Sequence, residues 1–348
     1  MIKNRTIPIV SGLFRVKTPN KNLNRSLNNF SFMAINNKLQ IWVLTRNRVN
    51  FLKETIESLI NQKTIYPYQI VISDNSTDSD TESFVQLEYP ELTYIRRNPT
   101  LESKEHFKKV FIESDCDFLV MFHDDDVLKE SYIQEMYGLL IQNKKLAAVG
   151  CNSDLIANKT YLLKDTFLNH KGQELIFSSG RQLATFYFDY SKTESSVPFP
   201  GYMYRKSFVK LEDFEIKYGG KYADVLLLMS VANRAPILFT RKVLMSYRMH
   251  SGNDSAQHSI CDRLSLLRYF IADKVFGKTS LVYRNARFNF WRIWYFSQDI
   301  TDSKFKRLVV RKYLFISLIR LIFFNPKFVY IYFRKYIFSR KLKALLCK

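Results

Sequence analysis

Short apolar runs alternate with amphipathic stretches from position 39 of the chain onward. The runs are rich in Ile, Val, Leu and Phe, which is typical of strands buried on both faces of a parallel sheet. The stretches between them place apolar residues on one helical stripe, as at Phe51, Ile56 and Leu59. The pattern predicts strands at Ile41–Leu44, Gln69–Ser73, Thr93–Arg96, Phe118–Phe122 and Leu146–Gly150, and helices at Asn50–Gln62, Ser79–Leu87, Ser103–Ser114 and Ser131–Asn143.

This alternation predicts an α/β fold with an open, Rossmann-like, mostly parallel sheet and helices on both sides. In such sheets, ligands bind beyond the carboxyl ends of the strands. Three predicted strands are followed there by polar segments, at residues 45–48, 74–78 and 123–126. We therefore expect the functional site at these three loops.

The pattern weakens between residues 151 and 200, where we expect irregular, substrate-specific insertions. The Pro-rich segment that ends at Gly201 reads as a loop before a short strand at Tyr202–Tyr204. After Ser259 the composition becomes basic and aromatic, and helical stretches are predicted near Arg263–Phe276 and Phe305–Phe324.

The net charge of +21 belongs to the two ends of the chain. Residues 1–37 carry six Lys/Arg and no acid, residues 38–260 carry 27 basic and 28 acidic residues, and residues 261–348 carry 20 basic and four acidic residues. We therefore divide the chain into a basic N-terminal extension, a main domain and a basic, aromatic helical region. Basic ends around a neutral middle favour an anionic membrane surface as partner over nucleic acid.

The C-terminal region combines an apolar stretch at residues 313–319 with basic residues at intervals of seven. A basic stripe beside a broad apolar surface suits helices lying in the membrane interface, and the alternative is a helical bundle packed on the main domain or a partner. We expect no spanning helix and no signal peptide. The four cysteines are widely spaced, which fits a reducing cytosol. The predicted location is therefore cytoplasmic, on the inner face of the membrane. The stripe consists of Arg320, Lys327, Arg334 and Lys341.

Three consecutive aspartates, Asp124, Asp125 and Asp126, follow a predicted buried strand. Adjacent carboxylates repel one another unless a cation or strong donors neutralise them, and oxygen ligands favour Mg²⁺ or Mn²⁺. The alternative is a solvated acidic turn before the next helix. Asp74 also ends a strand, and on its own it is better explained by an ordinary turn. No glycine-rich phosphate loop is present, which disfavours dinucleotide oxidoreductases and kinases.

These segments resemble the family 2 glycosyltransferases, which are nucleotide-diphospho-sugar transferases with the GT-A fold, over about residues 39–255. The family's Thr-Tyr-Asn-Arg loop, Asp-Gly-Ser-Thr-Asp turn and Leu-Asp-x-Asp-Asp motif are similar to residues 45–48, 74–78 and 122–126, although Asn75 and His123 depart from the pattern. Three later segments extend the resemblance. Residues 201–205 are similar to the family's Gly-rich acceptor strand, and residues 247–255 are similar to its Tyr-Arg-x-His closing motif. Residues 221–227 are similar to its Glu-Asp-x-x-Leu segment, although Ala223 replaces the Glu.

The resemblance implies a role for each matching residue. Asp224 would be the catalytic base, for which simple capping of a helix is the alternative. His250 would approach the metal and the diphosphate, and Arg248 would be either a phosphate ligand or a structural residue. The full set is donor-binding Thr45, Asn47, Arg48, Asp74, Asp124 and His250, metal-binding Asp125, Asp126 and His250, and acceptor-side Gly201 and Tyr202.

The resemblance implies an inverting transfer of a sugar from a nucleotide-diphosphate sugar to a glycan or lipid-linked acceptor, in bacterial surface polysaccharide synthesis. The cofactor would be Mn²⁺ or Mg²⁺. The enzymatic alternative is a nucleotidyltransferase, which normally needs a glycine-rich loop that residues 45–50 lack. The remaining alternative is a membrane-bound scaffold that binds nucleotide or sugar without turnover.

Overall fold

The computed structural model describes residues 38–157, 161–164, 174–188, 199–215, 220–250 and 304–324, with short helical pieces at 262, 265–266, 268–269, 283–284, 287–288 and 290–291. The N-terminal extension, most of the stretch predicted as a helix near Arg263–Phe276, and the last 24 residues lie outside this description. Three basic residues of the C-terminal stripe, Lys327, Arg334 and Lys341, are therefore outside it as well.

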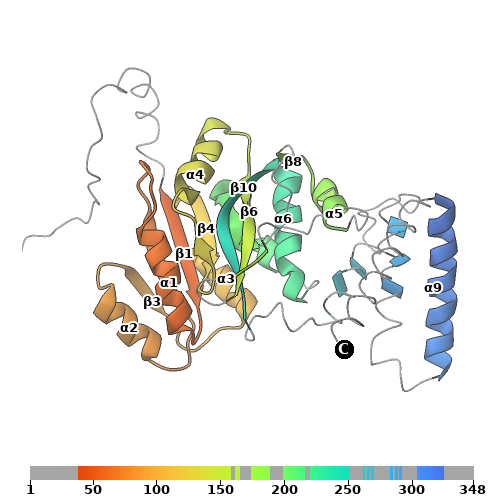
Figure 1. Ribbon diagram of the computed structural model, residues 1–348, viewed down its shortest axis with the longest axis horizontal. Helices are drawn as coiled ribbons and strands as arrows, with labels where there is room; N and C mark the ends of the chain where they lie inside the picture. Colours follow the sequence, from red (N-terminus) through yellow and green to blue (C-terminus); the bar gives the residue numbers. More distant parts are fainter. Residues whose placement is uncertain are drawn as a thin grey trace, which may run out of the picture.

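A ten-stranded sheet with helices on both faces forms the centre of the described chain (Figure 1). The strand order is β3-β2-β1-β4-β9-β6-β10-β5, and β7 and β8 pair with β6 and β10. Six strands (β1, β2, β3, β4, β6 and β10) run in the same direction, which confirms the mostly parallel, Rossmann-like α/β sheet. The strands are β1 (Leu39–Thr45), β2 (Gln69–Asp74), β3 (Thr93–Arg96), β4 (Phe118–His123), β5 (Val127–Leu128), β6 (Ala148–Ala157), β7 (Tyr161–Lys164), β8 (Leu175–Phe177), β9 (Tyr202–Arg205) and β10 (Ile237–Met249).

The helices connect these strands, and α9 lies at the end of the molecule opposite α2 (Figure 1). The α-helices are α1 (Val49–Ile60), α2 (Asp80–Glu88), α3 (Ser103–Glu113), α4 (Tyr132–Gln142), α5 (Gly180–Phe188), α6 (Ala223–Arg234) and α9 (Lys304–Phe324). Four 3₁₀ turns, η1 (Phe199–Gly201), η2 (Lys206–Phe208), η3 (Leu211–Phe214) and η4 (Gly220–Tyr222), complete the described elements.

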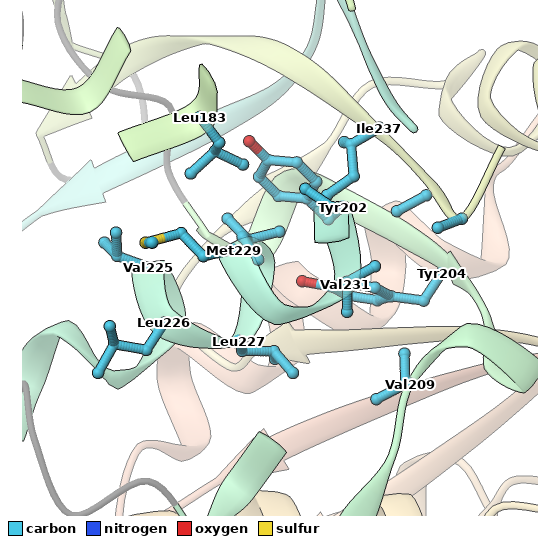
Figure 2. Packing of buried hydrophobic residues seen from close by; sticks show 14 of the residues in the cluster. Leu183, Tyr202, Tyr204, Val209, Val225, Leu226, Leu227, Met229, Val231 and Ile237 are labelled. Carbon is cyan, nitrogen blue, oxygen red and sulfur yellow. The ribbon is translucent and has the colours of Figure 1, made fainter. Parts of the chain in front are cut away.

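Alternating side chains of β1 are buried in two different hydrophobic clusters, one on each face of the sheet. Ile41 and Val43 pack with residues of α1 and α4, whereas Trp42 and Leu44 belong to the cluster on the other face, with residues of α3 and α6. This period of two explains why the predicted strand reads as a continuous apolar run. Figure 2 shows this second cluster around α6, in which Val231 lies near Tyr204 of β9; Val225, Met229 and Tyr202 belong to the same cluster.

The segment between residues 151 and 200 is more regular than the sequence predicts. β6 continues to Ala157, and β8 and α5 follow it in the described part of this segment. The polar residues Asn152 and Ser153 interrupt the apolar run by which the strand could be recognised in the sequence. Both are nevertheless fully buried, because β6 pairs in parallel with β10 over this length. Gly150 belongs to the same strand, and a Cβ atom there would lie 2.4 Å from the Tyr202 ring, so only glycine fits.

Candidate active site

The predicted polar loops meet at one edge of the sheet because their strands run in the same direction. The segments after β1, β2, β4 and β10 all leave the sheet at this edge. Direct contacts join them: the Arg46 amide donates to Asp124 Oδ2 at 3.1 Å, and His250 Nε2 lies 2.9 Å from Asp125 Oδ2. The closing segment of β10 thus reaches the acidic loop of β4, although about 125 residues separate them.

All three aspartates of the acidic loop are buried, with exposed fractions of 2%, 6% and 1% for Asp124, Asp125 and Asp126. Burial and the neighbouring Asp125 charge raise the pKa of Asp124 to about 6, and Arg48 opposes this rise. The same two causes raise the pKa of Asp126. The expected alternative, a solvated acidic turn, does not describe these carboxyl groups, because they are enclosed by protein.

Three side chains of this loop can direct ligand atoms to one point. One ligand atom each from His123, Asp125 and Asp126 lies within 4.8 Å of the others. Asp126 Oδ2 is buried and accepts no hydrogen bond, so the loop holds an acceptor that a cation would satisfy. The donor set of carboxylates and one imidazole fits a divalent metal ion. His123 was assigned no ligand role from sequence, but a histidine directly before three aspartates is the signal that could have indicated one.

Arg48 supplies positive charge to the acidic loop. Its guanidinium lies 3.1 Å from Asp124 Oδ1 and 2.9 Å from Asp125 Oδ2. Arg48 precedes α1, so the same residue ends the β1 loop and begins the helix behind it. The protein therefore offsets part of the repulsion between these carboxylates itself.

Asn47 joins the loops that follow β1 and β2. Its backbone is left-handed, with φ of 56°, a conformation that asparagine tolerates better than most residues. Its side-chain oxygen accepts from the Thr77 amide at 2.8 Å, and its backbone amide donates to Ser76 Oγ at 2.8 Å. Asn47 thus fixes the loop geometry, while its predicted contact with the donor remains a prediction.

The Asp74 carboxylate is fully buried and already has protein partners. The Ser76 amide donates to Oδ1 at 2.8 Å, while the Tyr94 hydroxyl and the Arg96 guanidinium lie 2.5 and 3.0 Å from Oδ2. The predicted contact of Asp74 with the donor base would therefore share or exchange one of these partners. Tyr94 and Arg96 lie on β3 and were not singled out from sequence.

Arg248 is held by protein groups on the inner side of the acidic loop. Its side chain is 1% exposed, Nε donates to the Asp125 carbonyl at 2.8 Å, and a terminal nitrogen lies 2.7 Å from Glu54 Oε2. Its backbone amide donates to Asp126 Oδ1 at 2.9 Å. Of the two roles left open by the sequence, these contacts favour the structural one.

Helix α1 supports the same loop from behind. The Thr55 hydroxyl lies 2.9 and 2.8 Å from the Asp124 and Asp126 carbonyls. Thr55 is fully buried, and with Glu54 it belongs to a helix that was predicted only as a packing element. Because a strand alternates its faces, Arg248 and His250 both point to α1, where the Phe51 ring lies 5.1 Å from the Arg248 guanidinium carbon and 4.6 Å from the His250 ring centre.

Asp224 lies in the first turn of α6, on the side of the sheet that packs against β9. Burial raises its pKa to about 6, against the lowering effect of backbone amides at the helix start. Its Oδ1 is buried without a hydrogen-bond partner, which capping alone does not explain. The charge of Asp224 also contributes to the raised pKa values of Tyr202 and Tyr204, so the carboxyl group lies near β9. A carboxylate with a pKa near neutrality suits a general base.

The predicted acceptor-side residues are buried. Tyr202 is 3% exposed and packs near Phe239, and Gly201 lies where a Cβ atom would approach Met245 Sδ to 3.0 Å and Cys151 Sγ to 3.2 Å. They form the base of this region, since β9 begins at the edge where β4 ends. A direct contact of either residue with an acceptor stays a prediction. Cys116 and Cys151 are free thiols in the described chain.

The chain resembles known glycosyltransferases in sequence and in structure. The model of the family "Glycosyl transferase family 2" matches residues 41–202. Among curated proteins, no sequence matches. S. aureus TarS 1-349 in complex with UDP-GlcNAc is 13% identical with a TM-score of 0.49, over 74% of this chain and 81% of TarS 1-349. The mannosyltransferase PcManGT from Pyrobaculum calidifontis, in complex with GDP-Man and Mn²⁺, is 12% identical with a TM-score of 0.46, over 90% of this chain and 88% of its own.

The residues that the family model matches include β2, β4, the whole acidic loop and most of β1. Helix α6 with Asp224 and the end of β10 with His250 lie outside the matched residues. Residues 41–202, which contain the acidic loop, are thus the part of the chain that matches the family 2 glycosyltransferases.

Proposed function

We propose that the protein transfers a sugar from a nucleotide-diphosphate sugar to a hydroxyl group of a glycan or lipid-linked acceptor, with inversion at the anomeric carbon. The observation that carries this proposal is the meeting of four strand-end segments on the buried acidic loop, beside a base candidate of raised pKa. The acceptor class and a role in bacterial surface polysaccharide synthesis rest on the resemblance of the motifs.

Asp125 and Asp126, together with His123 or His250, would hold Mn²⁺ or Mg²⁺. Such an ion, when bound, supplies positive charge that favours departure of a nucleoside diphosphate. Thr45, Arg48, Asp74 and Asp124 would line the donor side, where Arg48 already contributes a fixed positive charge to the carboxylates.

Asp224 would accept the proton of the acceptor hydroxyl. The freed oxygen forms a bond to the anomeric carbon, the bond from that carbon to the diphosphate breaks, and the nucleoside diphosphate leaves with the electron pair. Because the oxygen attacks from the face opposite the leaving group, an α-linked donor gives a β-linked product. The raised pKa of Asp224 supports this role, because a more basic carboxylate accepts a proton more readily.

The anomeric configuration of the product, measured by NMR with the natural donor once it is known, tests this mechanism. A β-linked product from an α-linked donor is expected. The variant Asp224→Asn should bind the nucleotide normally and lose turnover, since it removes a group needed chiefly in the transition state. Retention of configuration, or equal loss of nucleotide affinity, would overturn the assignment of Asp224.

We further propose that the main domain spans residues 38–260 and works at the inner face of the cell membrane, close to a lipid-linked acceptor. In the described part of the chain, no helix combines the length and apolarity needed to cross a bilayer. The basic charge of residues 261–348 supports attraction to anionic lipid.

A further inference from the structure

Exposed apolar side chains concentrate on one element of the described chain. Of the eleven large hydrophobic residues exposed there, six lie on α9. Four exceed 40% exposure, and they are Leu308 at 65%, Phe315 at 62%, Ile322 at 45% and Phe323 at 80%. Such a concentration on one helix indicates a contact surface, because single exposed apolar residues are ordinarily scattered.

All of these six residues except Tyr313 share one face of α9. With 3.6 residues per turn, Leu308, Phe315, Ile319 and Ile322 fall within about 60° of one another around the helix axis. Ser317 lies on the opposite side and is 6% exposed. Tyr313, farther round the helix from the apolar face, stacks on Trp291 at 4.7 Å between ring centres. The helix therefore has an inner face packed on the protein and an outer apolar face, which we call the α9 outer face: Leu308, Phe315, Ile319, Ile322 and Phe323.

The charge on α9 has one sign. The helix carries six Lys/Arg and no acidic residue. Exposed Arg311 lies at one side of the α9 outer face, beside Ile322, and exposed Lys312 lies within it, between Ile319 and Phe323. A second copy of α9 would bring like charges together, so self-association through this face is disfavoured. Nucleic acid would meet the basic groups but leave the central Leu, Ile and Phe without an apolar partner. An anionic lipid surface matches both kinds of side chain, because acyl chains accept the apolar groups and headgroups attract the Arg311 and Lys312 charges, which sit at the ends of long side chains.

We infer that the α9 outer face docks the protein on an anionic membrane, with the helix lying in the plane of the interface. This inference rests on the proposed function only in placing the acceptor at the membrane. It also refines the sequence prediction, because the docking residues lie N-terminal to most of the basic stripe and Arg320 is the one stripe residue on α9. Helix α9 lies at the end of the molecule opposite α2 (Figure 1).

Flotation of the full chain with lipid vesicles tests the inference. We expect the protein to bind vesicles of phosphatidylcholine mixed with phosphatidylglycerol, and this binding should weaken at high salt. Binding to vesicles of phosphatidylcholine alone should be much weaker. The double variant Phe315→Glu/Ile319→Glu should lower the partition coefficient between water and vesicles at least about tenfold. It removes two apolar side chains that would be buried in the lipid and adds negative charge that anionic headgroups repel. Leu87→Glu, at an exposed position of α2, is the matched control, and this variant should bind the vesicles as the parent does.

Two outcomes would overturn the inference: equal binding of the Phe315→Glu/Ile319→Glu variant and the parent, or no binding to anionic vesicles. A concentration-dependent dimer in light scattering that the double variant abolishes would assign the face to a second copy instead. Nucleotide titration of the same samples in solution separates these outcomes from the catalytic proposal. If nucleotide binds but vesicles do not, only the docking surface is wrong.

Discussion

Arg248 and Glu54 form an ion pair of 2.7 Å between β10 and α1, although 194 positions separate them in the chain. The Arg248 guanidinium also contacts the Asp125 carbonyl, so the pair braces the acidic loop from its inner side. Removing one partner of a buried ion pair leaves the other charge uncompensated, which costs more than the pair itself contributes.

The variant Arg248→Met should therefore lower the free energy of unfolding by about 3–5 kcal/mol. In Glu54→Gln/Arg248→Met both charges are gone, and part of the loss should be recovered. Denaturant unfolding of the parent, both single variants and the double variant gives the coupling energy directly. Additive effects of the two substitutions would show that the ion pair does not act as a unit.

Thr55→Val should loosen the acidic loop without creating a cavity. The hydroxyl bridges the Asp124 and Asp126 carbonyls, and its loss should cost about 1–3 kcal/mol and weaken metal-dependent nucleotide binding. Thr240→Val, at a buried position near the other end of β10, is the matched control. If both variants bind nucleotide equally well in calorimetry, Thr55 has no special part in holding the loop.

The raised pKa of Asp224 predicts that activity falls as the pH drops below about 6, where the base becomes protonated. The folded-state pKa exceeds the ordinary value of 3.8, so the folded state binds this proton more tightly than the unfolded state does. Stability should accordingly decrease as the pH rises from about 4 to about 6, and Asp224→Asn should remove that contribution. Unfolding curves of parent and variant across this pH range test the sign.

Asp74→Asn should weaken nucleotide affinity about tenfold or more if the carboxylate contacts the base, because a charged acceptor is lost. Tyr94→Phe removes one donor from the same carboxylate and preserves its charge, so its effect should be smaller. A larger loss of affinity in Tyr94→Phe than in Asp74→Asn would indicate that the β3 side chains, and not Asp74, determine binding. Calorimetry with each variant measures this difference.

Strands β1 to β4 and helices α1 to α4 were predictable because their apolar positions repeat with clear periods, whereas the two-residue strand β5 was not predicted. The predicted ends of α1, α2, α3 and α4 differ from the structure by at most two residues. β6 and β10 were harder to find, because polar residues such as Asn152 and Ser246 are buried inside the sheet there and break the pattern. Burial of polar groups depends on partner strands, which a single segment of sequence does not reveal.

The positions of Asp74 and Asp125 were predictable, because Asp74 ends β2 and Asp125 lies two residues after β4, while their roles stay predictions. The supporting residues of the site were not predictable, because Glu54, Thr55 and Tyr94 look like ordinary positions of a helix or strand. Their contacts depend on which elements become neighbours in space. The burial of Tyr202 shows the same limit, since its position after a loop favours exposure while packing beside Gly150 places it in the core.

The acidic loop is expected to bind a nucleotide through a metal ion. Calorimetric titration of UDP, GDP, CDP and dTDP, with and without Mn²⁺ or Mg²⁺, tests it, with Asp125→Asn as the site variant and Asp115→Asn, exposed before β4, as the control. One nucleotide should bind only with metal, Asp125→Asn should abolish that binding, and Asp115→Asn should preserve it. Failure of every nucleotide to bind, or undiminished metal-dependent binding by Asp125→Asn, would contradict the account.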